Sequence, residues 1–586
     1  MHEIRMILQF VKPYRKLAAF SLAMLVLMVA SDLLIPHLIE RIIDQGIRQN
    51  NMTVVLQTAA IMLGISIFNA VFAVLNSNSS VRIGESVARD IREALFVKIQ
   101  QLSYGDLDRF STGKLMVRLT SDASAVQRLV QISLRIGTRA PLLMIGSIVL
   151  MFVTNAHLAT LMIPLLVITV AVIAAFSFKM EPMFRIVQQK LDRLNTVLQE
   201  NIAGVRLVKA FVRADFEAQR FEAANEELTD QTIGVMQLMS TMSPVLTTLI
   251  NAGMVIVIWS GGLQTIQGEM MIGQIVAFTN YLLTTMTPLL LMAQLSNVWA
   301  NGLASAQRID EVLDTIPEVQ EAAEAIALPV QATDQVDFQD VSFHYRGDSD
   351  MAVLENIYLA AESGQSVAVL GATGAGKSSL VNLIPRFYDA TSGKVQIDEM
   401  DVRSLKSGSI LSRVGIVPQE AILFSGTIRE NIRYGKPDAS DDEVVAAAKA
   451  AQAHDFILNL PQGYHTHVEE RGANLSGGQK QRISIARALI TQPHILILDD
   501  ATSAVDVETE TCIQDALKEI MRGKTSFIVA QRISTVLNAD KIVVLDRGRI
   551  VAEGRHLDLL KTSPIYQEIY DSQLGNGSSF RAEEEA

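Results

Sequence analysis

The stretch GATGAGKSS occupies residues 371–379, directly after the apolar run SVAVL at 366–370. Glycines permit a tight loop whose backbone N–H groups converge on phosphate oxygens. Lys377 would neutralise phosphate charge, and the hydroxyl of Ser378 is a ligand for Mg²⁺. The predicted nucleotide contacts are Gly371, Thr373, Gly374, Ala375, Gly376, Lys377, Ser378 and Ser379. We therefore expect a strand, a phosphate-binding loop and a helix here.

A second motif, HILILDD at 494–500, is an apolar strand that ends in Asp499. Its carboxylate can hold a metal-linked water near the phosphates, although a buried strand that merely ends in an acid has the same pattern. Between these strands lies LSGGQKQR at 475–482, in which a serine and paired glycines lead into a helix. A hydroxyl and backbone N–H groups there would bind another phosphate. The predicted contacts of this motif are Ser476, Gly477, Gly478 and Gln479.

The order of these motifs resembles that of the ATP-binding cassette (ABC) family, in which LSGGQ stands between two such strands. Further motifs in the family's order are VSFHY at 341–345, GIVPQ at 415–419, ERGANLSGGQ at 470–479 and SAVD at 503–506. The resemblance implies a P-loop α/β domain that binds ATP and Mg²⁺. It also implies that two such domains pair head to tail, so that each nucleotide lies between one chain's phosphate loop and the other's LSGGQ.

The resemblance assigns roles to two residues that carry no signal of their own. Tyr345 occupies the position of the family's adenine-stacking aromatic, a role that suits a flat ring. Gln419 occupies the position of the residue that reaches Mg²⁺ and water, so the predicted metal contacts are Ser378 and Gln419. Without the resemblance, Tyr345 is interpreted as a core residue and Gln419 as a polar loop residue.

Two positions depart from the family pattern, and both concern hydrolysis. Asp500 stands where the general base is usually Glu, and Gln531, in FIVAQR at 527–532, stands where a His usually contacts the γ-phosphate. Asp is one methylene shorter, and a displacement of about 1 Å can cost about a hundredfold in rate. Glutamine donates hydrogen bonds but shuttles no proton near neutral pH. We therefore predict a site that binds ATP and hydrolyses it slowly, with Asp500, Gln531 and Gln419 as its catalytic residues.

The composition indicates a membrane protein with a soluble part. The chain has 586 residues, 49% of them hydrophobic, and a mean hydropathy of +0.27. Long uncharged runs lie mostly before residue 301, whereas the remainder has the strand and helix alternation of a soluble α/β domain. A formal charge of −12 argues against nucleic acid as a partner. Cys512 is the single cysteine, so the chain forms no internal disulfide.

Six segments approach the roughly 20 apolar residues that a hydrocarbon core of about 30 Å requires. The predicted spans are 17–39, 55–76, 138–154, 157–178, 243–263 and 274–299. The charged, helix-patterned stretches 77–137 and 179–242 predict helix extensions beyond the bilayer. They carry nine and eight Lys plus Arg, whereas 155–157 and 264–273 carry none. The positive-inside rule therefore places the extensions and both chain ends in the cytosol of a cell-membrane protein.

Six membrane helices followed by a cassette domain resemble an ABC exporter half-transporter of the multidrug-exporter kind, over nearly the whole chain. We predict a transmembrane domain at 1–300, a linker at 301–335, the ATP-binding cassette at 336–575 and a polar tail at 576–586. In the family, short helices at the tips of the extensions rest on the nucleotide domains, and by position these are 106–122 and 208–221. An ordinary amphipathic helix surface is the alternative for both stretches.

The partner and the cargo are hypotheses at this point. An intact LSGGQ on a chain with a weak base favours a heterodimer, in which a second half-transporter supplies a Glu base and a switch His. The alternatives are a homodimeric lipid or drug exporter and a nucleotide-gated channel or sensor. The predicted cargo is a small amphipathic drug, lipid or peptide that is carried out of the cytosol. Membrane lipids are predicted to contact the transmembrane domain. Asp32, late in the first span, either lines the path or marks a hydrated helix end.

Overall fold

The computed structural model describes residues 2–329, 331–345, 352–500, 513, 521 and 523–574. The chain divides into two compact units. Unit 1 consists of Met1–Gln100 and Thr112–Thr315, and unit 2 consists of Gln101–Ser111 and Ile316–Ala586. Three features predicted from the sequence lie outside the described residues, namely SAVD at 503–506, Cys512 and the tail at 576–586.

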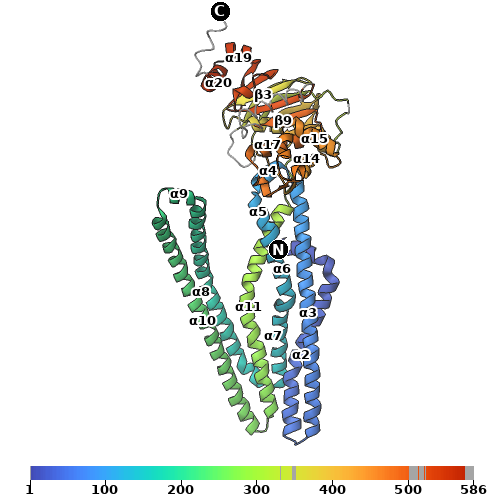
Figure 1. Cartoon of the computed structure of the whole chain (residues 1–586). Coiled ribbons are helices and arrows are strands. Elements are labelled where there is room, and N and C mark those ends of the chain that lie inside the picture. Colours follow the sequence, from blue (N-terminus) through green and yellow to red (C-terminus); the bar gives the residue numbers. More distant parts are fainter. Residues whose placement is uncertain are drawn as a thin grey trace, which may run out of the picture. The chain divides into compact units, whose positions relative to one another are not determined.

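Unit 1 is built from helices (Figure 1). Its α-helices are α1 (His2–Val11), α2 (Arg15–Arg41), α3 (Met52–Gln101), α5 (Thr112–Val117), α6 (Ala123–Ile132), α7 (Arg139–Thr154), α8 (Ala156–Ala203), α9 (Val205–Ala210), α10 (Ala214–Ile266) and α11 (Ile272–Leu313). Short 3₁₀ or π-helical segments lie at Lys12–Tyr14, Ile42–Ile47, Arg118–Asp122 and Ser133–Gly137. Because α11 runs on to Leu313, the helix continues well into the stretch that we expect to be a linker.

Five helical stretches among the described residues are long and apolar enough to cross a membrane. They are His2–Ile47, Met52–Gln101, Thr112–Thr154, Ala156–Ala203 and Ala214–Ile266. Each contains one of the first five predicted spans. The sixth predicted span, 274–299, lies on α11, whose side chains are described only in part. It stays a prediction.

The helices α3, α8 and α10 are much longer than a bilayer is thick. They have 50, 48 and 53 residues. At about 1.5 Å per residue each is about 75 Å long, against about 30 Å of hydrocarbon. The long helix extensions are therefore present, although the first is interrupted after Gln101, where Ser103 caps the short helix α4 (Tyr104–Arg109). The side of the membrane on which they lie stays a prediction.

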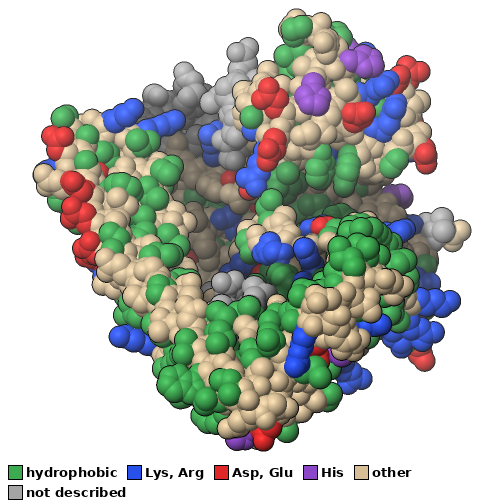
Figure 2. Space-filling view, turned by 90° about the horizontal axis from the view of Figure 1, so that it is seen from below, with side chains coloured by type: hydrophobic (Ala, Val, Ile, Leu, Met, Phe, Trp, Pro, Cys, Tyr) green, Lys and Arg blue, Asp and Glu red, His purple; other side chains and the backbone are tan. Residues whose placement is uncertain are grey.

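Large hydrophobic side chains are exposed along the membrane-length helices. Leu63, Val153, Phe178 and Trp259 are between 65% and 78% exposed. Figure 2 shows hydrophobic side chains over much of one face of the molecule. In water such a surface would drive association, whereas lipid tails are as apolar as the side chains themselves. The outer surface of unit 1 therefore suits a bilayer.

The helices of unit 1 form two groups. Helices α8 and α10 run side by side and are joined through α9, while α11 packs against α2, α6 and α7 (Figure 1). Two ion pairs fix the last turns of α11. Arg308 donates to the buried carboxylate of Asp122, and the buried Arg118 donates to Glu311 at 2.8 Å. The end of α11 is thereby attached to the π-helical segment Arg118–Asp122.

Unit 2 combines two larger sheets, a two-stranded ribbon and short helices. Its strands are β1 (Val336–Phe343), β2 (Leu354–Ala361), β3 (Ser366–Gly371), β4 (Ser392–Ile397), β5 (Met400–Asp401), β6 (Val414–Val417), β7 (Gly426–Thr427), β8 (His467–Val468), β9 (Ile495–Asp499), β10 (Thr525–Ala530), β11 (Lys541–Asp546) and β12 (Arg549–Gly554). Its helices include α4, α12 (Lys377–Asn382), α13 (Ser407–Leu411), α14 (Ile428–Arg433), α15 (Asp441–Ala450), α16 (His454–Leu458), α17 (Gly477–Leu489), α19 (His556–Thr562) and α20 (Pro564–Leu574).

The six-stranded sheet has the order β12-β11-β3-β10-β9-β6, and its strands are parallel except β12. The four-stranded sheet, β2-β1-β4-β5, is antiparallel. Every residue of β9 and β10 is buried, because the four-stranded sheet packs on one face and α14 to α17 pack on the other. The α/β domain predicted from the phosphate loop is confirmed.

The short helix α4 belongs to unit 2, although its sequence neighbours on both sides belong to unit 1. The ring of Tyr104 stacks on Phe387 with centroids 4.0 Å apart, and the hydroxyl of Tyr388 donates to Asp108 at 2.7 Å. The part of the predicted contact region 106–122 that lies in α4 therefore packs on the nucleotide unit, while the part from Thr112 onward belongs to unit 1.

Asp334 connects the amino ends of three strands of the six-stranded sheet. Its buried carboxylate accepts from Arg413, just before β6, at 2.7 Å and lies 3.0 Å from Nδ1 of His494, just before β9. Its carbonyl oxygen accepts from the hydroxyl of Thr525, the first residue of β10, at 2.8 Å. This single residue thus aligns the strands whose opposite ends carry the predicted site.

We expect Asp334→Ala to destabilise unit 2 by about 3 kcal/mol, because removing one partner of a buried ion pair leaves the other charge uncompensated. Glu355→Ala breaks the exposed pair with Arg549 and should cost less than about 1 kcal/mol. Thermal unfolding of the purified full chain measures both. Equal melting temperatures for the two variants would contradict the role given to Asp334.

Candidate functional site

The predicted site lies where three parallel strands of the six-stranded sheet end. Strand β10 pairs with β3 on one side and β9 on the other, and Val529 lies opposite both Val369 and Asp499. Because the three strands run in the same direction, their carboxyl ends meet at one edge of the sheet. The phosphate loop after β3, Asp499 at the end of β9 and Gln531 after β10 therefore lie together.

The glycines of the loop are required by its backbone. Gly374 and Gly376 have φ values of 83° and 97°, which side chains rarely tolerate. A Cβ on Gly376 would also lie 2.8 Å from the carbonyl oxygen of Val353. A Cβ on Gly371 would collide with the carbonyl oxygen of Leu545. The loop therefore keeps a tight path that leaves its backbone open toward the cavity.

Lys377 begins α12, and its side chain is buried. Its Nζ donates to the carbonyl oxygens of Gly371 and Ala372, both at 2.9 Å. Burial lowers the pKa of Lys377, while the nearby carboxylates of Asp500 and Asp499 act in the opposite direction. An ammonium group held in this way can exchange its carbonyl partners for phosphate oxygens.

Ser378 and Asp499 form the oxygen-rich corner of the site. The hydroxyl of Ser378 donates to Oδ1 of Asp499 at 3.0 Å. Burial raises the pKa of Asp499, and the hydrogen bond from Ser378 opposes that shift. Hydroxyl and carboxylate oxygens are the ligands that Mg²⁺ prefers, directly or through water, so these residues fit the predicted metal.

Tyr345 lies just beyond β1, half-buried beside the phosphate loop. Its hydroxyl lies 2.8 Å from Oγ of Ser379. Phe343 and Tyr388 meet its ring edge to face, at centroid distances of 4.8 and 5.3 Å. These contacts fix the ring next to the cavity, in a position that suits the predicted stacking on adenine.

Asp500 and Gln531 are brought into direct contact. Nε2 of Gln531 donates to Oδ2 of Asp500 at 3.0 Å. Asp500 has a left-handed backbone with φ 48°, and its carbonyl oxygen accepts from Gln481 at 3.2 Å. The two residues that depart from the family pattern therefore form one hydrogen-bonded pair. Sequence reasoning gave no role to Gln481, although it stands in the quoted LSGGQKQR motif.

A cavity of about 300 Å³ unites most of the predicted residues. Its lining consists of Tyr345, Val353, Thr373, Gly374, Gly376, Lys377, Ser378, Ser379, Gln419, Asp499, Asp500, Val529 and Gln531. Gly371 and Ala375 support the loop without lining this cavity. Val353 and Val529 also line the cavity, but the sequence analysis did not predict them. An aliphatic residue at a strand end belongs to no motif that would indicate such a role.

The LSGGQ motif lies at the surface, at the amino end of α17. The hydroxyl of Ser476 accepts from the Gln479 N–H at 3.3 Å, and Oε1 of Gln479 accepts from the Ser476 N–H at 3.0 Å. Among the described residues that line the cavity, none comes from 475–479. One chain therefore does not bring this motif to its own phosphate loop, which is what head-to-tail pairing requires.

Comparison with known proteins identifies the family. Residues 18–289 match the family model described as "ABC transporter transmembrane region", and residues 354–503 match the one described as "ABC transporter". The chain is also 39% identical to the uncharacterized ABC transporter ATP-binding protein YfiB of Bacillus subtilis, over 98% of this chain and 99% of that one. This chain belongs to the ABC transporter family.

Two further relatives refine the comparison. The ATP-dependent lipid A-core flippase of Syntrophus aciditrophicus is 38% identical over 84% of this chain and 81% of its own. The structure of a bacterial Atm1-family ABC exporter with ATP bound has a TM-score of 0.79 and 28% identity, covering 96% of this chain and 98% of that one. This ABC transporter thus has a transmembrane and an ATP-binding domain in an Atm1-like fold.

Membership of the family carries several consequences. The protein is a multi-pass membrane protein with the fold of an ABC exporter, and its ATP-binding domain implies an ATPase coupled to transport. Such a domain binds ATP, normally with Mg²⁺. ABC exporters act as dimers, with a second half-transporter or with a copy of the same chain.

Lys377→Ala should weaken ATP binding by about ten- to a hundredfold, because it removes the buried cation that faces the phosphates. Lys541→Ala is the matched control, since Nζ of Lys541 also donates to a backbone carbonyl, that of Ala360, at 2.8 Å. Photolabelling with an azido analogue of ATP measures both. Unchanged labelling of the Lys377 variant would show that this loop is not the nucleotide site.

Tyr345→Ala should lower ATP affinity by about 1 to 3 kcal/mol, the range found when a base loses its aromatic partner. Tyr345→Phe and Tyr345→Trp retain a ring and should retain affinity, even though the phenylalanine variant loses the contact with Ser379. Equilibrium titration with ATP distinguishes the three. Equal affinity in all of them would make Tyr345 a core residue only.

Proposed function

We propose that this chain is one subunit of a heterodimeric ATP-driven exporter of amphipathic molecules, and that its own ATP site is the slow one. The observation that carries the proposal is the hydrogen bond between Gln531 and Asp500, 3.0 Å long, at the edge of the phosphate cavity. It joins the two residues to which we attribute slow hydrolysis, in a site that otherwise keeps its predicted binding groups.

ATP would be bound by the phosphate loop, the ring of Tyr345 and the carboxylate of Asp499. Lys377 and the loop backbone would bind the phosphates, and the ring of Tyr345 would stack on adenine. Ser378 and Gln419 would be ligands of Mg²⁺, with Asp499 acting through a water. When bound, Mg²⁺ neutralises charge on the phosphate oxygens. All five side chains line one cavity, so a single nucleotide can reach them together.

Slow hydrolysis follows from the chemistry of the Asp500 and Gln531 pair. A general base must reach the proton of the attacking water, and the shorter Asp side chain stands farther back than Glu would. One of its carboxylate oxygens already accepts the amide of Gln531. Glutamine carries no positive charge and transfers no proton, so it stabilises γ-phosphate charge less than a protonated His would.

An intact LSGGQ on this chain supports a different partner rather than a second copy. In a head-to-tail pair, Ser476 and the glycines after it face the nucleotide bound by the partner's phosphate loop. Their preservation is useful only if that opposing site hydrolyses ATP. We therefore infer a partner half-transporter with a Glu base and a switch His, in the same cell membrane and with both chain ends in the cytosol.

Two alternatives make different predictions about transport. A homodimeric lipid exporter is favoured by the relative named a lipid A-core flippase. A nucleotide-gated channel or sensor would use slow ATP occupancy to switch a pore. In sealed vesicles, accumulation of a probe against its gradient requires a pump, whereas a channel gives only downhill flux.

The asymmetry is tested with the pair isolated from its native membrane by a tag on this chain. Asp500→Asn should leave most of the ATPase activity, because the partner's site supplies it. Replacing the partner's Glu by Gln should abolish activity, and Ser476→Ala should also be severe because Ser476 faces the competent site. Steady-state ATPase and transport assays measure all three.

The reverse change provides a gain-of-function control. Asp500→Glu combined with Gln531→His should raise hydrolysis at this chain's own site by about ten- to a hundredfold, the range expected when a positioned base is restored. The asymmetric proposal is wrong if Asp500→Asn is as inactive as the partner variant, or if this chain alone is a fast ATPase.

A further inference from the structure

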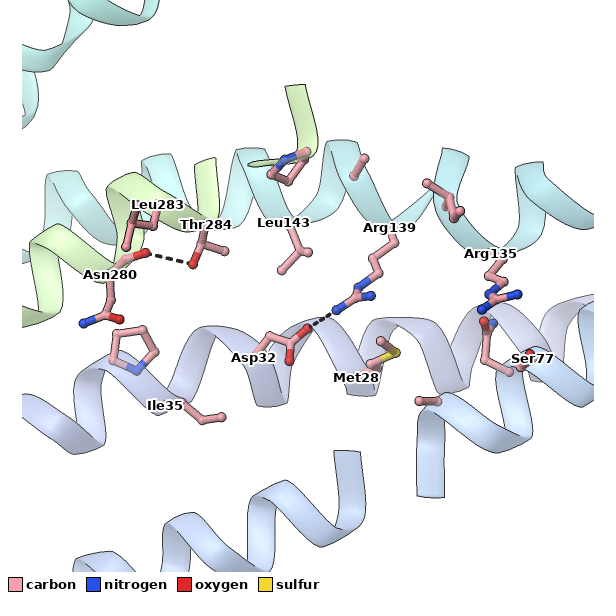
Figure 3. Close-up of a pocket in the computed structure, with 16 residues that line it drawn as sticks. Met28, Asp32, Ile35, Ser77, Arg135, Arg139, Leu143, Asn280, Leu283 and Thr284 are labelled. Carbon is pink, nitrogen blue, oxygen red and sulfur yellow. Dashed lines mark hydrogen bonds and ion pairs between the residues drawn. The ribbon is translucent and has the colours of Figure 1, made fainter. Parts of the chain in front are cut away.

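Unit 1 contains a cavity of about 670 Å³ among α2, α3, α7 and α11. Sixteen residues line it, and three of them are charged: Asp32, Arg135 and Arg139 (Figure 3). Arg135 lies in the π-helical segment that precedes α7, one helical turn before Arg139. In Figure 3 Arg139 points toward Asp32 of α2, and Arg135 points toward Ser77 of α3.

The charges of this cavity do not cancel. Oδ2 of Asp32 accepts from Arg139 at 2.9 Å, and Oδ1 accepts from Nδ2 of Asn69 at 2.6 Å, so both carboxylate oxygens are occupied. Arg135 has no hydrogen bond or ion pair within the part of the chain that the structure describes. Its side chain is exposed to the cavity. The lining therefore carries one uncompensated positive charge.

The cavity is also polarised along its length. Arg135 and Ser77 lie at one end, Leu143 lies between the ends, and Ile35 and Leu283 lie toward the other end beside the uncharged Asn280 and Thr284 (Figure 3). Arg135 and Leu143 are two helical turns apart, about 12 Å at 1.5 Å per residue. A cation at one end and an uncharged, partly aliphatic lining toward the other match a molecule with an ionic head and a largely apolar body.

We propose that this cavity binds an amphiphile with a single anionic group, which Arg135 contacts while the apolar part lies along Leu143 and Leu283. The proposal rests on the exporter function proposed above and specifies the class of its cargo. The ion pair between Asp32 and Arg139 cancels the charge of Arg139 and leaves that of Arg135 available.

Anionic, neutral and cationic ligands should therefore bind to this cavity with different affinities, the anionic ones most tightly. In surroundings of low dielectric, a charge without a partner attracts an opposite charge more strongly than it does in water. A cationic head would meet Arg135 with no acid other than the occupied Asp32 among the residues described as lining the cavity. A carboxylate or a phosphate has the same favourable chemistry here, whether it belongs to a lipid of the bilayer or to a soluble amphiphile.

Trp299 offers a reporter close to the charged end. Its Nε1 lies 4.0 Å from the position that a Cβ on Gly137 would take, two residues from Arg135. The chain has two tryptophans, and the other, Trp259, is an exposed residue of α10. In a Trp259→Phe background, contact quenching by bromine therefore reports binding near Trp299.

The test uses the purified full chain in phosphatidylcholine vesicles without nucleotide. Three eleven-carbon probes carry bromine next to the head, so that it lies at the Arg135 end near Trp299, and they differ only in the head: 2-bromoundecanoate, 2-bromoundecan-1-ol and 2-bromoundecyltrimethylammonium. We expect the carboxylate to bind at least about tenfold more tightly than the ammonium probe. Arg135→Gln should weaken the carboxylate about tenfold and leave the alcohol unchanged, which also shows that the variant is folded.

Two further variants sharpen the result. Asp32→Asn removes the acid that neutralises Arg139, so it should tighten carboxylate binding several-fold, opposite in direction to Arg135→Gln. Arg185→Gln is the matched control, because it removes a cation of α8 that pairs with Glu181 and does not line the cavity. Its binding of all three probes should equal that of the unchanged chain.

The outcomes separate this proposal from the exporter function. Equal affinity for the three heads, or an equal loss of all three in Arg135→Gln, would overturn the anionic site even if ATP-driven transport is found. Charge selection without ATP-driven transport would support the site and refute the exporter. Competition by phosphatidylglycerol in the vesicles supports a bilayer lipid as the anion, and no competition supports a soluble amphiphile.

Discussion

The parallel pairing of β3, β10 and β9 is the constraint on which the nucleotide unit depends. It brings the phosphate loop together with a carboxylate and a glutamine that follow it by more than a hundred residues of sequence. Asp334 fixes the opposite ends of β6, β9 and β10 through Arg413, His494 and Thr525. The geometry of the phosphate site therefore depends on the whole sheet. A change that misaligns the strands at the Asp334 end would also displace the site residues at the opposite end.

The sequence alone was sufficient for the α/β domain and for the loop, because glycine spacing and apolar strands are local signals. Positive φ values at Gly374 and Gly376 agree with that interpretation. The contact between Asp500 and Gln531 could not be predicted, since it depends on which strands are neighbours in the sheet. The placement of α4 with the nucleotide unit is a similar case, because its flanking helices belong to unit 1.

The contacts of Asp32 in the membrane unit could not be predicted from the sequence either. Its position near the end of a span left two interpretations open, because a periodic pattern does not show which side chains from other helices come near it. The structure supplies Arg139 and Asn69, which lie 107 and 37 residues away in the chain. With both oxygens of Asp32 engaged, the acid belongs to a cavity wall, and Arg135 becomes the charge without a partner.

The nucleotide site and the proposed membrane cavity each contain a cation, but the two cations differ in how their charge is compensated. At the nucleotide site, Lys377 is buried and held by two carbonyl oxygens, so its charge is kept in place until phosphate arrives. In the membrane cavity, the charge of Arg139 is matched by Asp32, and that of Arg135 is left exposed. A cation without a partner beside an apolar surface is costly unless a ligand compensates it. That cost would be lowest when the cavity is filled, so a ligand there would stabilise the arrangement of α2, α7 and α11 that forms it.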